Sequence, residues 1–258
     1  MNTSLFVVQE KILENSSKYK LYEKLNKECG DKCTYVSYCS KVQYLEKWYS
    51  GFLNVCYMFA RNWINLHEIL SEETDKDKHC RYINFWITDY VRKKLETQWK
   101  NVSFIGSIFR FFITVKHSIT SASRNNNCHF DYISEADINL WKEWKHLHDY
   151  IENYNDIKQR ISSHGNFCTK YSKYFAYIKG LHDKHKGKCC NGSSNKCRYH
   201  IDLSYICKND SLFNELKCDK TKGITAVTQG DGKHQPMDVS QEGEKSPSIL
   251  KMITFSHS

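Results

Sequence analysis

The residues of this chain with the most distinctive chemistry are its cysteines, of which there are 12, all before Asp219. They stand at Cys29, Cys33, Cys39, Cys56, Cys80, Cys128, Cys168, Cys189, Cys190, Cys197, Cys207 and Cys218. An even and high count is typical of a domain from an oxidising compartment, with up to six disulfide bonds here. We therefore take all twelve as disulfide candidates.

The N-terminus points to a different compartment. Residues 1–10 contain only the short apolar run Leu5–Val8, and no basic residue precedes it. This pattern is not that of a classical signal peptide. The cysteine count and the N-terminus therefore conflict, and composition alone leaves the compartment open.

Zinc binding is the alternative use of these cysteines, in an intracellular zinc-stabilised helical scaffold. Six residues of suitable type lie close in sequence: His182, His185, Cys189, Cys190, Cys197 and His200. However, the two-residue spacer between cysteines that marks most structural zinc sites occurs nowhere in the chain. Adjacent cysteines would also strain to share one tetrahedral ion, so we favour disulfides and expect no bound metal.

Motifs of catalysis are incomplete. His67-Glu68 begins like the zinc-protease motif, but Ser71 stands where the second histidine is needed. The run Gly230–Lys233 lacks the four-residue spacer of a phosphate-binding loop. Glu72-Glu73 lies in a polar turn, where solvation explains an acidic pair. We therefore expect no enzyme and no cofactor, although a small hydrolase would be a second alternative.

The element that organises the chain is a stripe of apolar residues between Lys41 and Leu70. It consists of Val42, Leu45, Tyr49, Phe52, Cys56, Phe59, Trp63, Leu66 and Leu70. Steps that alternate between three and four residues place all of them on one face of an α-helix. The spacing predicts a single helix of about 30 residues, on the order of 45 Å long.

Other segments also predict helices, and none shows the alternation of a strand. The expected helices cover Leu5 to about Asn26, a segment from near Cys80 to Leu95, Ser134 to Ile161, Phe167 to about Gly180, and Arg198 to Leu216. Val102–Val115 is the most apolar window, but it is too short to span a bilayer and predicts a core helix. The fold class expected is all-α, a disulfide-bridged multi-helix ectodomain.

One disulfide can be excluded from this helical pattern. If two antiparallel helices are joined by a turn near Asp75, Cys56 lies about fourteen residues farther from the turn than Cys80. This offset is about 20 Å along the axis, whereas a disulfide tolerates a Cα separation of about 6 Å. Cys56 should therefore not pair with Cys80.

Composition changes near residue 218. Both prolines, Pro236 and Pro247, come after it, and beyond Asp219 the chain contains no Cys, Trp or Tyr. We expect one helical cysteine-rich domain over residues 1–218 and a flexible, disordered tail over 219–258.

The net charge is +9, from 38 basic and 29 acidic residues. Such an excess favours acidic partners. Because the lysines are spread along the chain and form no clustered stripe, we expect a solvated basic surface and no nucleic-acid partner.

Several blocks of the sequence resemble the Plasmodium interspersed repeat (PIR) family, in particular its VIR branch. They are Tyr19–Asn26 leading to Cys29, the segment Cys80–Trp86, Cys128 before a helix rich in Trp and Lys, Leu147–Tyr154, and Cys168 followed by Tyr171, Tyr174 and Ile178. Each motif is loose, but their order and spacing cover about residues 19–218.

This resemblance implies a helical, cysteine-bridged variant surface antigen of a malaria parasite, exported to the infected red cell without a classical signal peptide. It also implies roles in antigenic variation, immune evasion or cell adhesion, with a host cell-surface receptor or antibodies as partners. The loops expected to vary are Ser121–Asn127 and Asn191–Lys196.

The C-terminus departs from the family pattern. Family members commonly carry a transmembrane helix there, whereas Ser248–Phe255 is apolar over only a few residues. The chain is therefore expected to be a short member, a truncated product or a soluble fragment, and its membrane association is open.

Overall fold

The computed structural model describes residues 2–30, 33–99, 105–120, 128–130, 132, 138–190 and 203–215. The chain divides into two units after Gly223, and all of these residues belong to the first unit. Within them every regular element is helical and none is a strand, which confirms the all-α fold class.

The elements are, in chain order, α1 (Asn2–Leu13), α2 (Leu21–Leu25), the 3₁₀ helix η1 (Val36–Lys47), α3 (Phe52–Ile64), α4 (Leu66–Ile69), α5 (Lys76–Thr97), α6 (Ile105–Thr120), α7 (Ile138–Glu152), α8 (Tyr154–Ser163), α9 (Phe167–Lys170), α10 (Ser172–Cys189), α11 (Ser204–Lys208) and α12 (Asp210–Glu215).

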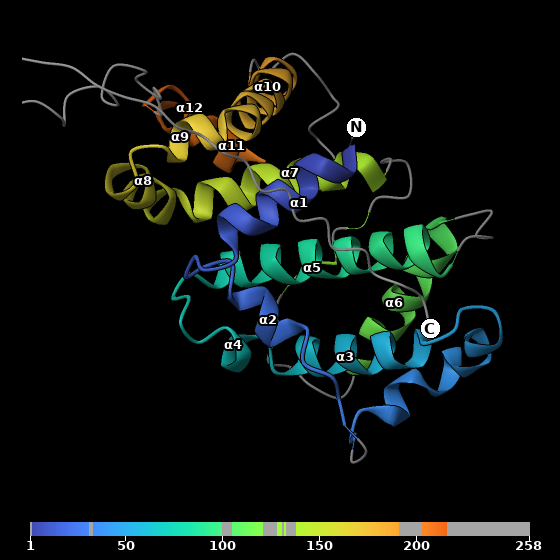
Figure 1. Cartoon of the computed structure of the whole chain (residues 1–258). Coiled ribbons are helices and arrows are strands. Elements are labelled where there is room, and N and C mark those ends of the chain that lie inside the picture. The colour runs from blue at the N-terminus through green and yellow to red at the C-terminus, as the bar shows by residue number, and fades with distance from the viewer. Residues whose placement is uncertain are drawn as a thin grey trace, which may run out of the picture. The chain divides into compact units, whose positions relative to one another are not determined.

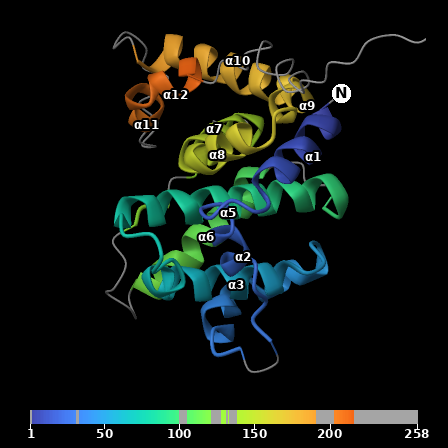
Figure 2. The ribbon, with the colours of Figure 1, turned by 60° about the vertical axis from the view of Figure 1, so that its left-hand side comes forward.

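These helices stack in successive layers within the first unit (Figures 1 and 2). η1 packs on α3, α3 packs on α6, and α5 lies between α3 and α7. On the other side of α7, α10 contacts α7, α11 and α12. As a result α5 and α7 have neighbours on two sides, and the aromatic core runs through them.

The prediction of one continuous helix over Lys41–Leu70 is wrong. Gly51 has φ +77°, in the left-handed region that ends a right-handed helix. The Glu46 carboxylate accepts hydrogen bonds from the N–H groups of Gly51 (2.6 Å) and Leu53 (2.8 Å), and so begins α3 anew. A second break follows at Asn65, between α3 and α4.

The apolar stripe is nevertheless the core face of this region. Eight of its nine residues are at most 3% exposed: Val42, Leu45, Phe52, Cys56, Phe59, Trp63, Leu66 and Leu70. The predicted apolar face is therefore found even though the predicted continuous helix is not, because each piece presents its own apolar side to the same core.

The helix predicted over Leu5–Asn26 is also interrupted. α1 ends at Leu13 and α2 begins at Leu21. Between them, the N–H of Ser17 donates to the Asp156 carboxylate (2.6 Å) and the N–H of Tyr19 donates to the Asn153 side chain (2.9 Å). These bonds to a distant part of the chain replace the bonds of a continuous helix.

The predicted helix Ser134–Ile161 divides in a similar way. α7 ends at Glu152 and α8 begins at Tyr154, because Asn153 has a non-helical backbone (φ −106°, ψ 14°). Its side chain donates to the carbonyl of Asp149 (2.7 Å) and accepts from Tyr19. Residues 134–137, the start of this predicted helix, lie outside the described residues.

The remaining predicted helices are found with different ends. The helix near Cys80 is α5, which begins at Lys76 after the cap Asp75. The Phe167–Gly180 helix divides into α9 and α10 and continues to Cys189. Within Arg198–Leu216 the structure describes α11 and α12. The apolar window is α6, whose Ile108, Phe109 and Phe112 are fully buried.

Candidate functional site

Every cysteine that the structure describes is disulfide-bonded. Four of the bridges are Cys29–Cys33, Cys39–Cys56, Cys80–Cys128 and Cys190–Cys207. Cys168 and Cys189 are disulfide-bonded as well. Cys56 therefore pairs with Cys39 and not with Cys80, while Cys197 and Cys218 lie outside the described residues.

Four of the six residues considered for zinc are described, and each has another partner, whereas Cys197 and His200 lie outside the described residues. Cys189 and Cys190 are in disulfides, which removes the thiolates that zinc would need. Nε2 of His185 lies 2.9 Å from the Glu143 carboxylate, and His182 stacks on Phe213 with ring centroids 3.9 Å apart. Among the described residues no group of three or more His, Cys, Asp or Glu could hold a metal ion.

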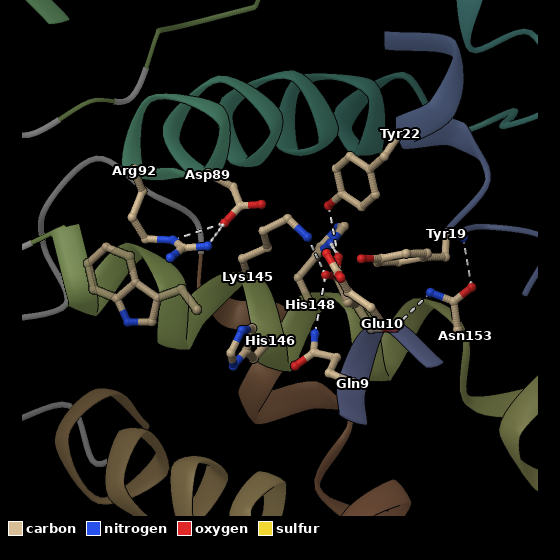
Figure 3. A network of polar contacts seen from close by, with 12 residues as sticks. Gln9, Glu10, Tyr19, Tyr22, Asp89, Arg92, Lys145, His146, His148 and Asn153 are labelled. Carbon is tan, nitrogen blue, oxygen red and sulfur yellow. Dashed lines mark hydrogen bonds and ion pairs between the residues drawn. The ribbon is translucent and has the colours of Figure 1, made fainter. Parts of the chain in front are cut away.

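A buried network of polar side chains lies where α5 and α7 meet the segment between α1 and α2 (Figure 3). Its centre is the ion pair between Lys145 and Asp149 on α7, with Nζ and Oδ2 2.5 Å apart and side chains 8% and 0% exposed. The Tyr22 hydroxyl donates to the same carboxylate (2.8 Å). The carboxylate of Asp149 is therefore held on several sides.

Electrostatics keep the carboxylates of this network ionised. Burial by itself would raise the pKa of the Asp149 carboxyl, but Lys145 and His148 lower it below its usual range. Burial likewise acts to raise the pKa of Asp89, and the cations Lys145, Lys93 and Arg92 outweigh it. An ionised carboxylate has no proton to donate, and its lowered pKa makes it a weak base, so these paired groups are better suited to joining helices than to proton transfer.

The second candidate feature is an exposed apolar surface on η1. Among the described residues the large hydrophobic side chains that are exposed are Val36 (49%), Tyr44 (50%) and Trp48 (77%), and all lie on η1 or directly after it. In a helix of three residues per turn, positions three apart share a face. The row Val36, Cys39, Val42, Leu45, Trp48 is accordingly buried in the middle and exposed at both ends.

Positive charge accompanies these apolar side chains. Lys41, Tyr44 and Lys47 form a neighbouring row at the same three-residue spacing, and both lysines are exposed. The Tyr44 ring packs edge-to-face on Phe111 of α6, with centroids 6.1 Å apart. We call Val36, Lys41, Tyr44, Lys47 and Trp48 the η1 surface. A polar groove lined by Ser37, Lys41 and residues of α6 continues from it.

The Cys39–Cys56 bridge holds the η1 surface on the molecule. It ties the first half of η1 to α3, with Cα atoms 6.2 Å apart. Because large aromatic side chains on a fixed backbone lose little conformational entropy on binding, this is favourable geometry for a protein contact.

The family is decided by comparison of the sequence with known families. The profile of the Plasmodium vivax Vir protein family matches residues 16–251, which is most of the chain. The chain belongs to the Vir family. This is a family of variant antigens and not of enzymes. No curated protein and no solved structure matches the chain.

The described part of this Vir protein contains no helix that is both long enough and apolar enough to cross a membrane. α6, the most apolar helix, is instead packed into the core through Phe109, Phe112 and Val115. The two loops expected to vary in this Vir protein, Ser121–Asn127 and Asn191–Lys196, lie outside the described residues.

Neither feature of the Vir protein was found from the sequence. A signal for the η1 surface exists, since Tyr44 and Trp48 are aromatic residues that lie off the apolar stripe beside them. The buried network has no such signal, because a Lys-Asp pair four residues apart is also typical of an exposed helix face.

Proposed function

We propose that this Vir protein is a non-enzymatic variant antigen, exported to the infected red cell, whose η1 surface contacts a host cell-surface protein. The observation that carries the adhesive part is the gathering of the exposed large hydrophobic side chains on one element. Tryptophan and tyrosine are enriched among the residues that dominate binding energy at protein interfaces.

Charge supports a partner that is acidic around the contact. Lys41 and Lys47 flank the exposed aromatic residues, and the chain as a whole carries +9. Complementary charge of this kind mainly accelerates association and selects partners. Antibodies raised against the antigen would meet the same exposed side chains, which connects the surface with antigenic variation and immune evasion.

The proposal is tested by measuring binding of the recombinant, disulfide-bonded chain to host red cells, leukocytes and endothelial cells. We expect saturable binding that Trp48→Ala weakens about tenfold or more and Tyr44→Ala weakens less, since Trp48 is the more exposed residue. Lys173→Ala, at an exposed position on α10, is the matched control and should leave binding unchanged.

Two results would count against the proposal. An absence of saturable binding to every host cell would exclude the adhesive role. Binding that survives both Trp48→Ala and Tyr44→Ala would exclude the η1 surface as the contact. Because Trp48 is 77% exposed, its replacement should leave the melting temperature unchanged, so lost binding would not reflect unfolding.

A further inference from the structure

A cavity of about 300 Å³ opens between the α1–α2 segment, α5 and α7. Its walls carry both aromatic rings and carboxylates: Tyr19, Tyr22, Trp86 and Tyr90, with Glu10, Glu14, Glu23 and Asp89. Two lysines, Lys93 and Lys145, also line it. Four carboxylates and two ammonium groups leave an excess of two negative charges, in a chain whose net charge is +9.

The two lysines of the cavity are already engaged. Nζ of Lys93 lies 3.2 Å from Glu10 and 3.3 Å from Asp89. Lys145 holds Asp149, and Figure 3 shows it extending between Asp89 and Tyr22. By contrast, Glu14 and Glu23 are exposed and form no ion pair within the part of the chain that is described. Their charge is available to a ligand.

The aromatic walls already stabilise a cation. Nζ of Lys145 lies 4.2 Å from the ring centroid of Tyr22 and 5.4 Å from that of Tyr19. A ring face within about 6 Å attracts an ammonium or guanidinium group. The Trp86 ring, which also lines the cavity, is held in place because its N–H donates to Asn26 (2.8 Å).

We propose that this cavity binds a guanidinium or ammonium group. Its volume is at the small end of ligand pockets, which suits one basic side chain or a small amine. The group would lie between the rings and face Glu14 and Glu23. This inference is independent of the η1 surface, since the two share no residue.

The experiment uses the full chain and N-acetyl-arginine methylamide as the probe, with binding followed by calorimetry and by the indole resonance of Trp86. The matched probe is the citrulline analogue, which has nearly the same shape and no charge. We expect saturable binding of the arginine probe at about 10 mM or tighter, and none of the citrulline probe. Binding that is absent, or equal for both probes, would overturn the proposal.

Three variants locate the site. Glu14→Gln with Glu23→Gln should weaken binding about fivefold. Lys93→Gln should strengthen it, because it releases the Glu10 carboxylate to the ligand, while Asp89 stays paired with Arg92. Glu68→Gln removes an exposed carboxylate outside the cavity and should change nothing. Equal effects of the Glu68 variant and the double variant would show that the cavity is not the site.

The source of the cation is decided by competition. A short arginine-containing peptide that displaces the probe more strongly than free spermidine would identify a partner polypeptide. The reverse order would identify a small free amine. Either result would support a ligand with a guanidinium or ammonium group. If neither compound displaced the bound probe, this proposal would be contradicted.

Discussion

Lys145 and Asp149 illustrate how a charged pair can be a core element. Both are nearly inaccessible, and each has further partners, since Tyr22 donates to Asp149 and the rings of Tyr19 and Tyr22 face Lys145. A second Lys-Asp pair with the same four-residue spacing, Lys179–Asp183, is about half exposed on α10. The chain thus contains the same pair in two environments.

The buried and the exposed pair allow the same substitution to be compared in two environments. Asp149→Asn should lower the free energy of unfolding by about 3–5 kcal/mol, because it leaves a buried cation without its partner. Asp183→Asn should lower it by less than about 1 kcal/mol, because water already solvates both charges. Denaturant unfolding of the two variants measures the difference. Equal, small losses would show that the buried network does not stabilise the fold.

The buried imidazole of His146 should make the stability of the fold depend on pH. Burial, with Lys145 nearby, lowers the pKa of its imidazole to about 3, although Asp149 and Asp89 act in the opposite direction. Nδ1 lies 2.9 Å from the Tyr177 hydroxyl. The pKa of His146 in the folded state therefore lies below its value of about 6.5 in the unfolded state. Below pH 6.5 the unfolded state binds a proton that the folded state does not, so the free energy of unfolding falls as the pH falls from 6.5 toward 3.

Between pH 7 and pH 5 the chain should therefore lose about 2 kcal/mol of stability that a His146→Gln variant does not lose. Denaturant unfolding at a series of pH values is the measurement. His117→Gln, an exposed position on α6, is the control and should keep the dependence of the unmodified chain. If the free energy of unfolding of His146→Gln fell with pH as steeply as that of the unmodified chain, His146 would not be the source of the pH dependence.

At the scale of elements, the breaks between helices decide which residues are presented to solvent. Gly51 reverses the chain between η1 and α3, and Glu46 caps the new helix. If this segment were one continuous α-helix, Trp48 would lie one turn before Phe52 on the same side of the helix. The break instead leaves Trp48 exposed, while the Cys39–Cys56 bridge holds η1 against α3.

The break at Gly51 can be tested with two alanine substitutions. Gly51→Ala should destabilise the chain by about 1–2 kcal/mol, because an L residue is strained at φ +77° even though its Cβ would meet only Lys94 at 3.9 Å. Gly180→Ala, within α10 and with open space around it, should stabilise by about 0.5–1 kcal/mol. Melting temperatures that move in the same direction for both variants would contradict the left-handed turn.

At the scale of the described unit, disulfides and packing have different roles. The four bridges whose two cysteines are both described join residues 4, 17, 17 and 48 positions apart. Side-chain hydrogen bonds join residues that are farther apart in the sequence. Examples are Arg160 donating to the carbonyl of Ile12 (2.6 Å) and Ser17 donating to Asp156.

Peptide mapping of the unreduced protein tests this pattern of bridges. We expect cross-linked peptides for Cys39–Cys56, Cys80–Cys128 and Cys190–Cys207, and no alkylation of these cysteines before reduction. A Cys56–Cys80 cross-link would contradict the helix arrangement, and mostly free thiols would contradict the oxidising compartment.

The sequence by itself determined the helical class, the buried stripe from Val42 to Leu70 and the family. These depend on residue spacing and residue type, which are local properties of the chain. Only the tertiary structure decided the breaks at Gly51 and Asn153, the exposure of Trp48 and the burial of Lys145 and Asp149. The physical reason is that each depends on partners distant in sequence or on a neighbouring layer: Tyr19 for Asn153, α5 and Tyr22 for the ion pair, and α3 and α6 for η1. Helical periodicity identifies the face that is buried, but it does not identify what buries it.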